Sequence, residues 1–129
     1  MSHQLYTDTT IDHFQSPRNI GRMDDADGVG MVGDPACGDF LTIYIKVVDQ
    51  VIEDVSYLVF GCAAAIASGS MTTELAKGKT VAEATKITEE DIVEYLGGLP
   101  ENKKHCSNLG AGALREAIAD YTQRRGARN

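Results

Sequence analysis

The sequence predicts an α+β domain, in which a small antiparallel sheet of about three strands carries helices packed on one face. The first observation is a period-two alternation within 40–48, where apolar side chains occupy every second position: Leu41, Ile43, Ile45 and Val47. The second is that runs with strand character come early in the chain, whereas runs rich in helix formers come late. Strands followed by helices indicate helices segregated to one face of an antiparallel sheet.

The N-terminal part of the chain is expected to hold one short helix and a long irregular stretch. A helix over 9–14 would take Thr9 or Thr10 as its cap and end before the proline that follows. Residues 18–38 are rich in Gly, Asp and Asn, which predicts a loop or an irregular strand. We therefore expect residues 1–25 to include a mobile N-terminal segment unless other parts of the domain hold it.

The middle of the chain predicts a hairpin and then a helix. A second strand over 51–60 follows a tight turn at Asp49-Gln50, so it pairs with the first. Helix formers over 63–77 end at Gly78, a residue suited to terminate a helix.

Three further helices are expected in the last part of the chain. Thr80 with Glu83, and Thr88 with Asp91, have the spacing of capping boxes and start two short helices. Ser107 is expected to cap a last helix that runs to about Arg124. Its apolar residues recur at spacings of three and four and form one stripe: Leu109, Ala113, Leu114, Ala117, Ile118 and Tyr121.

The bulk properties describe one domain and exclude several classes of function. At 129 residues, the whole range 1–129 is expected to form a single domain. A formal net charge of −7 argues against a nucleic-acid-binding surface. No apolar run approaches the ~18 residues of a membrane span. The start of the chain lacks both the basic residues and the apolar stretch of a signal peptide, so we expect a cytoplasmic protein.

Three cysteines in such a chain favour metal or thiol chemistry over a disulfide framework. Each is expected at the end of an element, where ligands are usually displayed: Cys37 before a strand, Cys62 between a strand and a helix, and Cys106 before the last helix. Cys62 and Cys106 are also expected at helix N-termini, where the helix dipole favours a thiolate. We therefore expect both thiols to lose their protons readily.

Two neighbouring side chains extend the set of candidate ligands. Asp39 lies two residues after Cys37, and in an extended segment such residues face the same side. His105 directly precedes Cys106, so the two would need a special loop geometry to bind one metal. Three sulfurs, a carboxylate and an imidazole suit zinc or an iron–sulfur centre.

The spacing of the cysteines favours a labile site over a static structural one. There is no Cys-x-x-Cys; 24 residues separate the first two cysteines and 43 separate the second from the third. A structural zinc site would normally bring its ligands in close pairs.

Three separated motifs give the chain a resemblance to a known family. GMVGDPACGD at 30–39 resembles the first motif of the IscU/NifU-type iron–sulfur cluster assembly scaffolds. FGCAAAIAS at 60–68 resembles their second cysteine motif, and HCS at 105–107 resembles the third. IDHFQSPRN at 11–19 is similar to their N-terminal segment, so the resemblance covers nearly the whole chain.

The resemblance implies an α+β fold whose ligands converge at one exposed end. It implies that Cys37, Cys62 and Cys106 hold a nascent [2Fe-2S] cluster, with Asp39 or His105 as a fourth ligand. Cys106, on a flexible approach, would receive sulfur as a persulfide from a cysteine desulfurase of the IscS/NifS type. Zinc can occupy such a site when no cluster is present.

The resemblance also implies a scaffold and not an enzyme, one that passes its cluster to recipient iron–sulfur apoproteins. The presence of His105 and the absence of a central insertion favour the IscU branch over the SufU branch. Lys103 matches a family position thought to assist at the site, although a solvated loop lysine explains it equally well. The sequence leaves open whether the working form is a monomer or a homodimer with clusters at its interface.

One departure from the family pattern concerns a partner. The IscU branch that works with an Hsp70-type chaperone usually carries Leu-Pro-Pro-Val-Lys before the histidine, and this chain has LPENK at 99–103. A chaperone partnership is therefore in doubt.

Two other functions remain open from the residues. One is a zinc-dependent sulfurtransferase relay of the SufU kind, in which a cysteine accepts sulfur and passes it to another protein. The other is a small zinc-stabilised binding module without sulfur chemistry.

Overall fold

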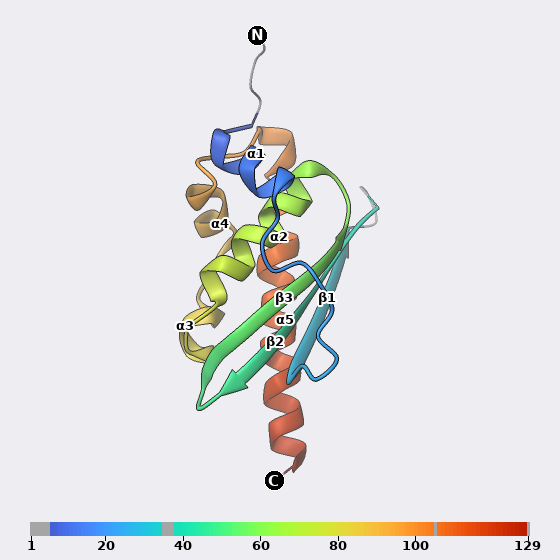
Figure 1. The fold of residues 1–129 in the computed structure, drawn as a ribbon, viewed down its shortest axis with the longest axis vertical. Helices are drawn as coiled ribbons and strands as arrows, with labels where there is room; N and C mark the ends of the chain where they lie inside the picture. Colours follow the sequence, from blue (N-terminus) through green and yellow to red (C-terminus); the bar gives the residue numbers. More distant parts are fainter. Residues whose placement is uncertain (1–5, 35–37, 105, 129) are drawn as a thin grey trace.

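The computed structural model describes residues 6–34, 38–104 and 106–128. Three strands form one antiparallel sheet in the order β1-β2-β3: β1 Gly28–Asp34, β2 Asp39–Val48 and β3 Val51–Phe60. The helices α2 (Ala63–Ala76) and α5 (Cys106–Arg128) pack on one face of this sheet (Figure 1). The prediction of an α+β fold with a three-stranded antiparallel sheet is confirmed.

The hairpin of β2 and β3 forms where it was expected. The turn residues Asp49 and Gln50 have φ values of 52° and 68°, the left-handed backbone that two-residue hairpin turns use. The register pairs Phe40 with Phe60 at the far end of the hairpin. The last residues of β3 therefore lie beside the first residues of β2.

The expectation of a loop or irregular strand over 18–38 is wrong for 28–34, because β1 pairs with β2 along its whole length. A Cβ atom at Gly28 would lie 2.2 Å from the carbonyl oxygen of Ala117 in α5, and one at Gly30 would lie 2.3 Å from that of Ala113. The glycines let the helix backbone lie directly on the strand. They also remove the apolar alternation by which a strand is normally recognised.

The N-terminal helix α1 (Asp8–Gln15) begins earlier than expected. Its cap is Thr7, not Thr9 or Thr10: Oγ1 of Thr7 accepts a hydrogen bond of 3.1 Å from the backbone N–H of Thr10. The Thr7 hydroxyl also donates to the carbonyl oxygen of Leu96. This second bond ties the start of α1 to the end of α4, a contact that the local sequence does not reveal.

The described part of the first 25 residues contacts the core. Asn19 and Gly21 exchange backbone hydrogen bonds of 2.9 Å with Tyr57 at the edge of β3. His13 is buried, with Nδ1 2.7 Å from Oγ of Ser70 in α2. Mobility of this segment in solution stays a prediction.

Helix α2 forms over nearly the range predicted, and it is buried on several sides. It contacts the sheet, α1, α4 and α5, and its buried polar side chains are Ser68, Ser70, Thr72 and Thr73. Two of their hydroxyls bond carbonyl oxygens of the same helix: Thr72 to Ser68 and Thr73 to Ser70, each at 2.7 Å. Small residues here let the neighbouring helices approach closely.

The two short helices start at the predicted capping boxes. Thr80 and Glu83 cap α3 (Val81–Thr85), and Thr88 and Asp91 cap α4 (Glu89–Tyr95), with side chain and backbone bonded reciprocally in both. A 3-10 turn, η1 (Glu101–Lys103), then leads toward α5 and was not expected.

The start of α5 corrects the prediction for the last helix. The helix begins at Cys106, so Ser107 lies inside its first turn and is not the cap. The Ser107 hydroxyl instead donates to the carbonyl oxygen of Lys104 at 2.7 Å. The predicted apolar stripe of α5 is buried throughout.

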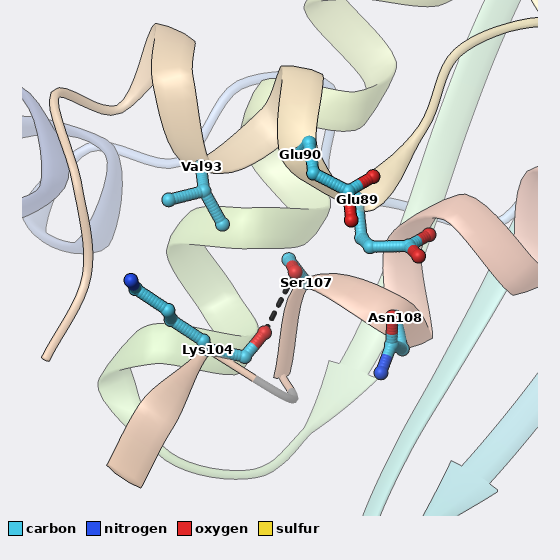
Figure 2. Close-up of a pocket in the computed structure, with 6 residues that line it drawn as sticks. All are labelled: Glu89, Glu90, Val93, Lys104, Ser107 and Asn108. Atoms are coloured by element: carbon cyan, nitrogen blue, oxygen red, sulfur yellow. Dashed lines mark hydrogen bonds between the residues drawn. The ribbon is translucent and has the colours of Figure 1, made fainter. Parts of the chain in front are cut away.

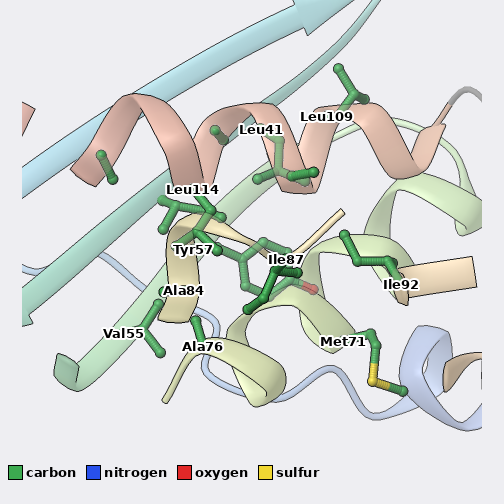
Figure 3. Packing of buried hydrophobic residues seen from close by; sticks show 14 of the residues in the cluster. Leu41, Val55, Tyr57, Met71, Ala76, Ala84, Ile87, Ile92, Leu109 and Leu114 are labelled. Carbon is green, nitrogen blue, oxygen red and sulfur yellow. The ribbon is translucent and has the colours of Figure 1, made fainter. Parts of the chain in front are cut away.

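One apolar core fills the space between the sheet and the helices (Figure 3). Leu41 and Tyr57 from the sheet meet Leu109 and Leu114 from α5 there, and the Tyr57 hydroxyl donates to the carbonyl oxygen of Ile66 at 2.7 Å. None of the helices in the described ranges is long and apolar enough to cross a membrane.

The close contact between β1 and α5 yields a stability prediction. In Gly30→Ala the added methyl group would meet backbone atoms of α5 at 2.3 Å, so the helix must move away from the sheet. We expect a loss of about 1–3 kcal/mol or more in the free energy of unfolding, measured by urea denaturation.

Gly112→Ala is the matched control in the same helix contact. A Cβ atom at Gly112 would meet only Val32, at 3.4 Å, an ordinary contact distance. Alanine should raise stability there by about 0.5–1 kcal/mol through helix propensity. Equal stabilities for the two variants would contradict the close-packing explanation.

Candidate metal centre

Three of the predicted site residues come together at one end of the molecule, each at the start of a different element. Asp39 begins β2, Cys62 is the N-cap of α2, and Cys106 begins α5. The starts of these three elements lie at the same end of the fold (Figure 1). Cys37 and His105 fall outside the described residues, so their part in the site stays a prediction.

The three donor atoms lie within 4.8 Å of one another. Sγ of Cys62 is 3.7 Å from Sγ of Cys106 and 3.6 Å from Oδ2 of Asp39, and Sγ of Cys106 is 4.0 Å from the same oxygen. Within the described ranges this is the one group of three or more metal-binding side chains.

These separations fit three corners of a tetrahedral metal site. Zn–S bonds of about 2.3 Å place two sulfur ligands about 3.8 Å apart, and a shorter Zn–O bond gives a slightly shorter S···O edge. The S···S edge of 3.7 Å and the 3.6 Å edge between Cys62 and Asp39 match this arrangement, whereas the 4.0 Å edge between Cys106 and Asp39 is slightly longer than it requires. The fourth corner is available to a further ligand.

Burial makes the donor cluster unusual for unbound side chains. Asp39 is 5% exposed and Cys106 is 1% exposed, whereas Cys62 is half-buried. Burying a carboxylate away from water is costly unless it is paired or binds a metal. In the metal-free state both thiols donate toward Oδ2 of Asp39, so protons stand where a cation would bind.

The thiol of Cys106 does not behave as its place at a helix N-terminus predicted. Burial raises the pKa of Cys106 to about 12, and the hydrogen bond to Cys62 and the charges of Cys62 and Asp39 act in the same direction. The nearby positive charge of Lys103 opposes them. The expectation that this thiol loses its proton readily is therefore wrong for the metal-free protein, because desolvation outweighs the helix dipole.

Two exposed aromatic residues lie next to candidate ligands in the sequence. Phe40 follows Asp39 and is 49% exposed, and its cross-strand partner Phe60, just before Gly61 and Cys62, is 74% exposed. Exposed apolar side chains of this size often mark a contact surface. Because Phe40 alternates with the buried Asp39 and Leu41, its ring lies on the face of the sheet away from the helices.

A separate hollow of about 380 Å³ lies between α4 and the start of α5 (Figure 2). It is lined by Glu89, Glu90 and Val93 of α4 and by Lys104, Ser107 and Asn108. None of the three donors lines it, so it is not part of the metal centre.

Comparison with known proteins identifies a matching protein family and several similar proteins. The family model described as the NifU-like N terminal domain matches residues 5–128. An iron-sulfur cluster assembly scaffold protein IscU 1 of Archaeoglobus fulgidus is 62% identical over 122 residues, covering 95% of this chain and 80% of that protein. The Escherichia coli K12 scaffold protein IscU is 48% identical over 127 residues, covering 95% and 98%.

Solved structures show the same fold. The crystal structure described as a putative scaffold protein for the SUF system from Fervidobacterium islandicum aligns with a TM-score of 0.76 at 25% identity, covering 92% of this chain and 99% of that one. A nitrogen-fixing NifU-like protein from Brucella abortus aligns with a TM-score of 0.74 at 21% identity, covering 93% and 96%.

The difference in burial between the two thiols predicts their order of reaction. In the metal-free protein we expect iodoacetamide to modify Cys62 before Cys106, because Cys106 is buried and its raised pKa keeps it protonated. The Cys106 rate should rise about tenfold per pH unit between about pH 7 and pH 9, with no plateau. Peptide mass mapping measures both rates.

Unfolding the protein in urea provides the control, since both thiols should then react at similar rates. Faster modification of Cys106 than of Cys62 in the folded protein, or a plateau near neutral pH, would contradict the structure.

Proposed function

This chain belongs to the family of NifU-like N-terminal domains, and on that premise we propose that it is a scaffold for iron–sulfur cluster assembly. It would hold iron and sulfur while a cluster forms and then pass the cluster to recipient apoproteins. The observation that carries the proposal is the convergence of Asp39, Cys62 and Cys106 within 4.8 Å. Their sulfur and oxygen donors are of the kind that such chemistry requires.

The cluster itself is the cargo of this site, and we propose a [2Fe-2S] type. Cys37, Cys62 and Cys106 would supply thiolates, the usual ligands of iron–sulfur clusters, and Asp39 or His105 would complete the set. Zinc would bind the same donors when no cluster is present. The edges measured between the donors of the metal-free site support this second role.

Sulfur would arrive from a cysteine desulfurase as a persulfide, with Cys106 as the acceptor. The Cys106 thiolate attacks the outer sulfur of the persulfide on the desulfurase cysteine. A new S–S bond forms at Cys106, the S–S bond of the desulfurase persulfide breaks, and the desulfurase cysteine leaves as a thiolate, with no net oxidation or reduction. Each transferred sulfur must then gain two electrons to become a bridging sulfide. An electron donor therefore has to take part.

The burial of Cys106 constrains this transfer. At 1% exposure its Sγ cannot be reached by another protein in the conformation described. Either the start of α5 moves, or the sulfur passes through Cys62, a half-buried residue whose Sγ is 3.7 Å away. Persulfide mapping by mass spectrometry distinguishes the two routes.

We propose that the scaffold releases a product without catalytic turnover, and that it acts in the cytoplasm. A partnership with an Hsp70-type chaperone stays in doubt, since Glu101 and Asn102 replace the Pro-Val of the usual Leu-Pro-Pro-Val-Lys motif. These two residues begin the turn η1. Such a scaffold could work as a monomer or as a homodimer with clusters at its interface.

Reconstitution with iron, cysteine and a desulfurase tests the function. We expect a visible absorbance that is lost when Cys37, Cys62 or Cys106 is replaced by alanine, because each removes a thiolate ligand. Persulfide on a cysteine without any cluster would favour a SufU-like relay. If neither forms and zinc removal unfolds the domain, a zinc-stabilised binding module is the better description.

Replacement of Asp39 tests the labile ligand. An oxygen among sulfurs gives the cluster one easily exchanged bond, so Asp39→Ala should prolong the cluster's lifetime during transfer to an apoprotein. Asp54→Ala is the control, since this exposed carboxylate on β3 pairs only loosely with Lys77, at 3.8 Å. An unchanged lifetime in Asp39→Ala would remove that role from Asp39.

A further inference from the structure

We propose that Gly61 is a positioning residue for the metal centre: its missing side chain leaves the space that the Asp39 carboxylate occupies beside Cys62 and Cys106. The inference rests on the proposed function, since it concerns how the fold aims one of the candidate ligands. Sequence reasoning did not assign a role to Gly61. The available signal was a glycine directly before a candidate ligand at the end of a strand.

The contact between the two residues is very close. A Cβ atom at Gly61 would lie 2.7 Å from Cγ of Asp39, 2.8 Å from Oδ1 and 3.1 Å from Cβ. Carbon atoms in contact prefer about 3.5–4.0 Å. A methyl group at position 61 and the observed carboxylate therefore cannot occupy the same structure.

The strand register explains why these residues meet. Phe40 pairs with Phe60, so Asp39 and Gly61 face each other one step beyond that pair. Side chains opposite each other across two strands usually have Cβ atoms about 4.5–5.5 Å apart. Asp39 instead leans across the glycine, which brings Oδ2 to 3.6 Å from Sγ of Cys62 and 4.0 Å from Sγ of Cys106.

The backbone does not itself require glycine at this position. Gly61 is not among the glycines with positive φ, so alanine can adopt its backbone conformation. Gly38 is the opposite case: its φ is +74° and no atom lies within 4 Å of its added Cβ. Space for a neighbour is what distinguishes Gly61.

Asp39 also has little freedom to avoid an added methyl group. Its side chain is 5% exposed, and it lies against the starts of α2 and α5. In Gly61→Ala we therefore expect the carboxylate to turn away from the two thiols. The variant should resemble a protein without the Asp39 ligand while it retains all three cysteines.

A double-mutant cycle with Gly61→Ala, Asp39→Ala and the double variant tests this inference. The first readout is zinc affinity, measured against a competing chelator. Gly61→Ala should weaken zinc binding by roughly tenfold or more, as expected when a ligand loses its support. The double variant should bind zinc no more weakly than Asp39→Ala alone. Wild-type affinity in Gly61→Ala, or losses that multiply in the double variant, would overturn the inference.

Thermal unfolding of the metal-free proteins is the second readout. Gly61→Ala should lower the melting temperature, and Asp39→Ala should restore most of that loss in the double variant, because the two closest contacts, at 2.7 and 2.8 Å, disappear with the carboxylate and only the 3.1 Å contact with Cβ remains. Melting temperatures that add independently would also overturn the inference. Gly112→Ala, a glycine with room for a methyl group, serves as the control.

Cluster lifetime separates this inference from the proposed function. If Asp39→Ala changes neither zinc affinity nor cluster lifetime, the ligand role proposed for Asp39 fails. If Asp39→Ala changes them and Gly61→Ala does not, only the positioning role of Gly61 fails.

Discussion

The close approach of α5 to the rest of the domain is the constraint on which the metal centre depends. The helix lies on β1 where Gly28 and Gly30 offer no side chains, and Gly110 lets it approach α2, since an added Cβ there would lie 2.2 Å from Oγ1 of Thr72. Cys106 is the first residue of this helix. A small outward shift of α5 would carry its Sγ away from Cys62 and Asp39. Glycines outside the donor set thus allow the close packing of α5 that places Cys106 beside Cys62 and Asp39.

In the metal-free protein the donor cluster is held together by hydrogen bonds from the thiols to the Asp39 carboxylate, and a cation would bind these donors more strongly than the protons do. A buried carboxylate and two thiols share a small volume, and burial keeps the Cys106 thiol protonated by raising its pKa. A metal ion bound there would displace those protons, and its positive charge would neutralise the Asp39 carboxylate. Metal binding should therefore release protons and strengthen the contact between the sheet and the helices that provide the ligands.

Much of the fold followed from local sequence, and the parts that did not have a common physical reason. The hairpin turn at Asp49-Gln50 and the helix capping boxes at Thr80 and Thr88 are local features, so short-range sequence patterns are sufficient to predict them. The regular strand β1 is not predicted by the local sequence, because its glycines are required by close contact with α5, which is distant in the chain. Cys106 was expected to ionise readily because its burial, which decides its pKa, is a property of the packed domain.

The candidate site shows the same division. Cys62 and Asp39 were selected from residue type and from their place at element ends, but their convergence was implied only by the family resemblance. The role inferred for Gly61 needed coordinates, because it depends on the space between two strands. Cys37 and His105 remain predictions of the sequence.

Zinc X-ray absorption most directly tests whether the fold brings these donors onto one metal. In the zinc-loaded wild-type protein we expect at least two sulfur neighbours at about 2.3 Å together with lighter oxygen or nitrogen atoms. Cys62→Ala and Cys106→Ala should each remove one sulfur from that shell, and Asp39→Ala should remove a light atom. A sulfur count that is unchanged in both cysteine variants would contradict a shared site.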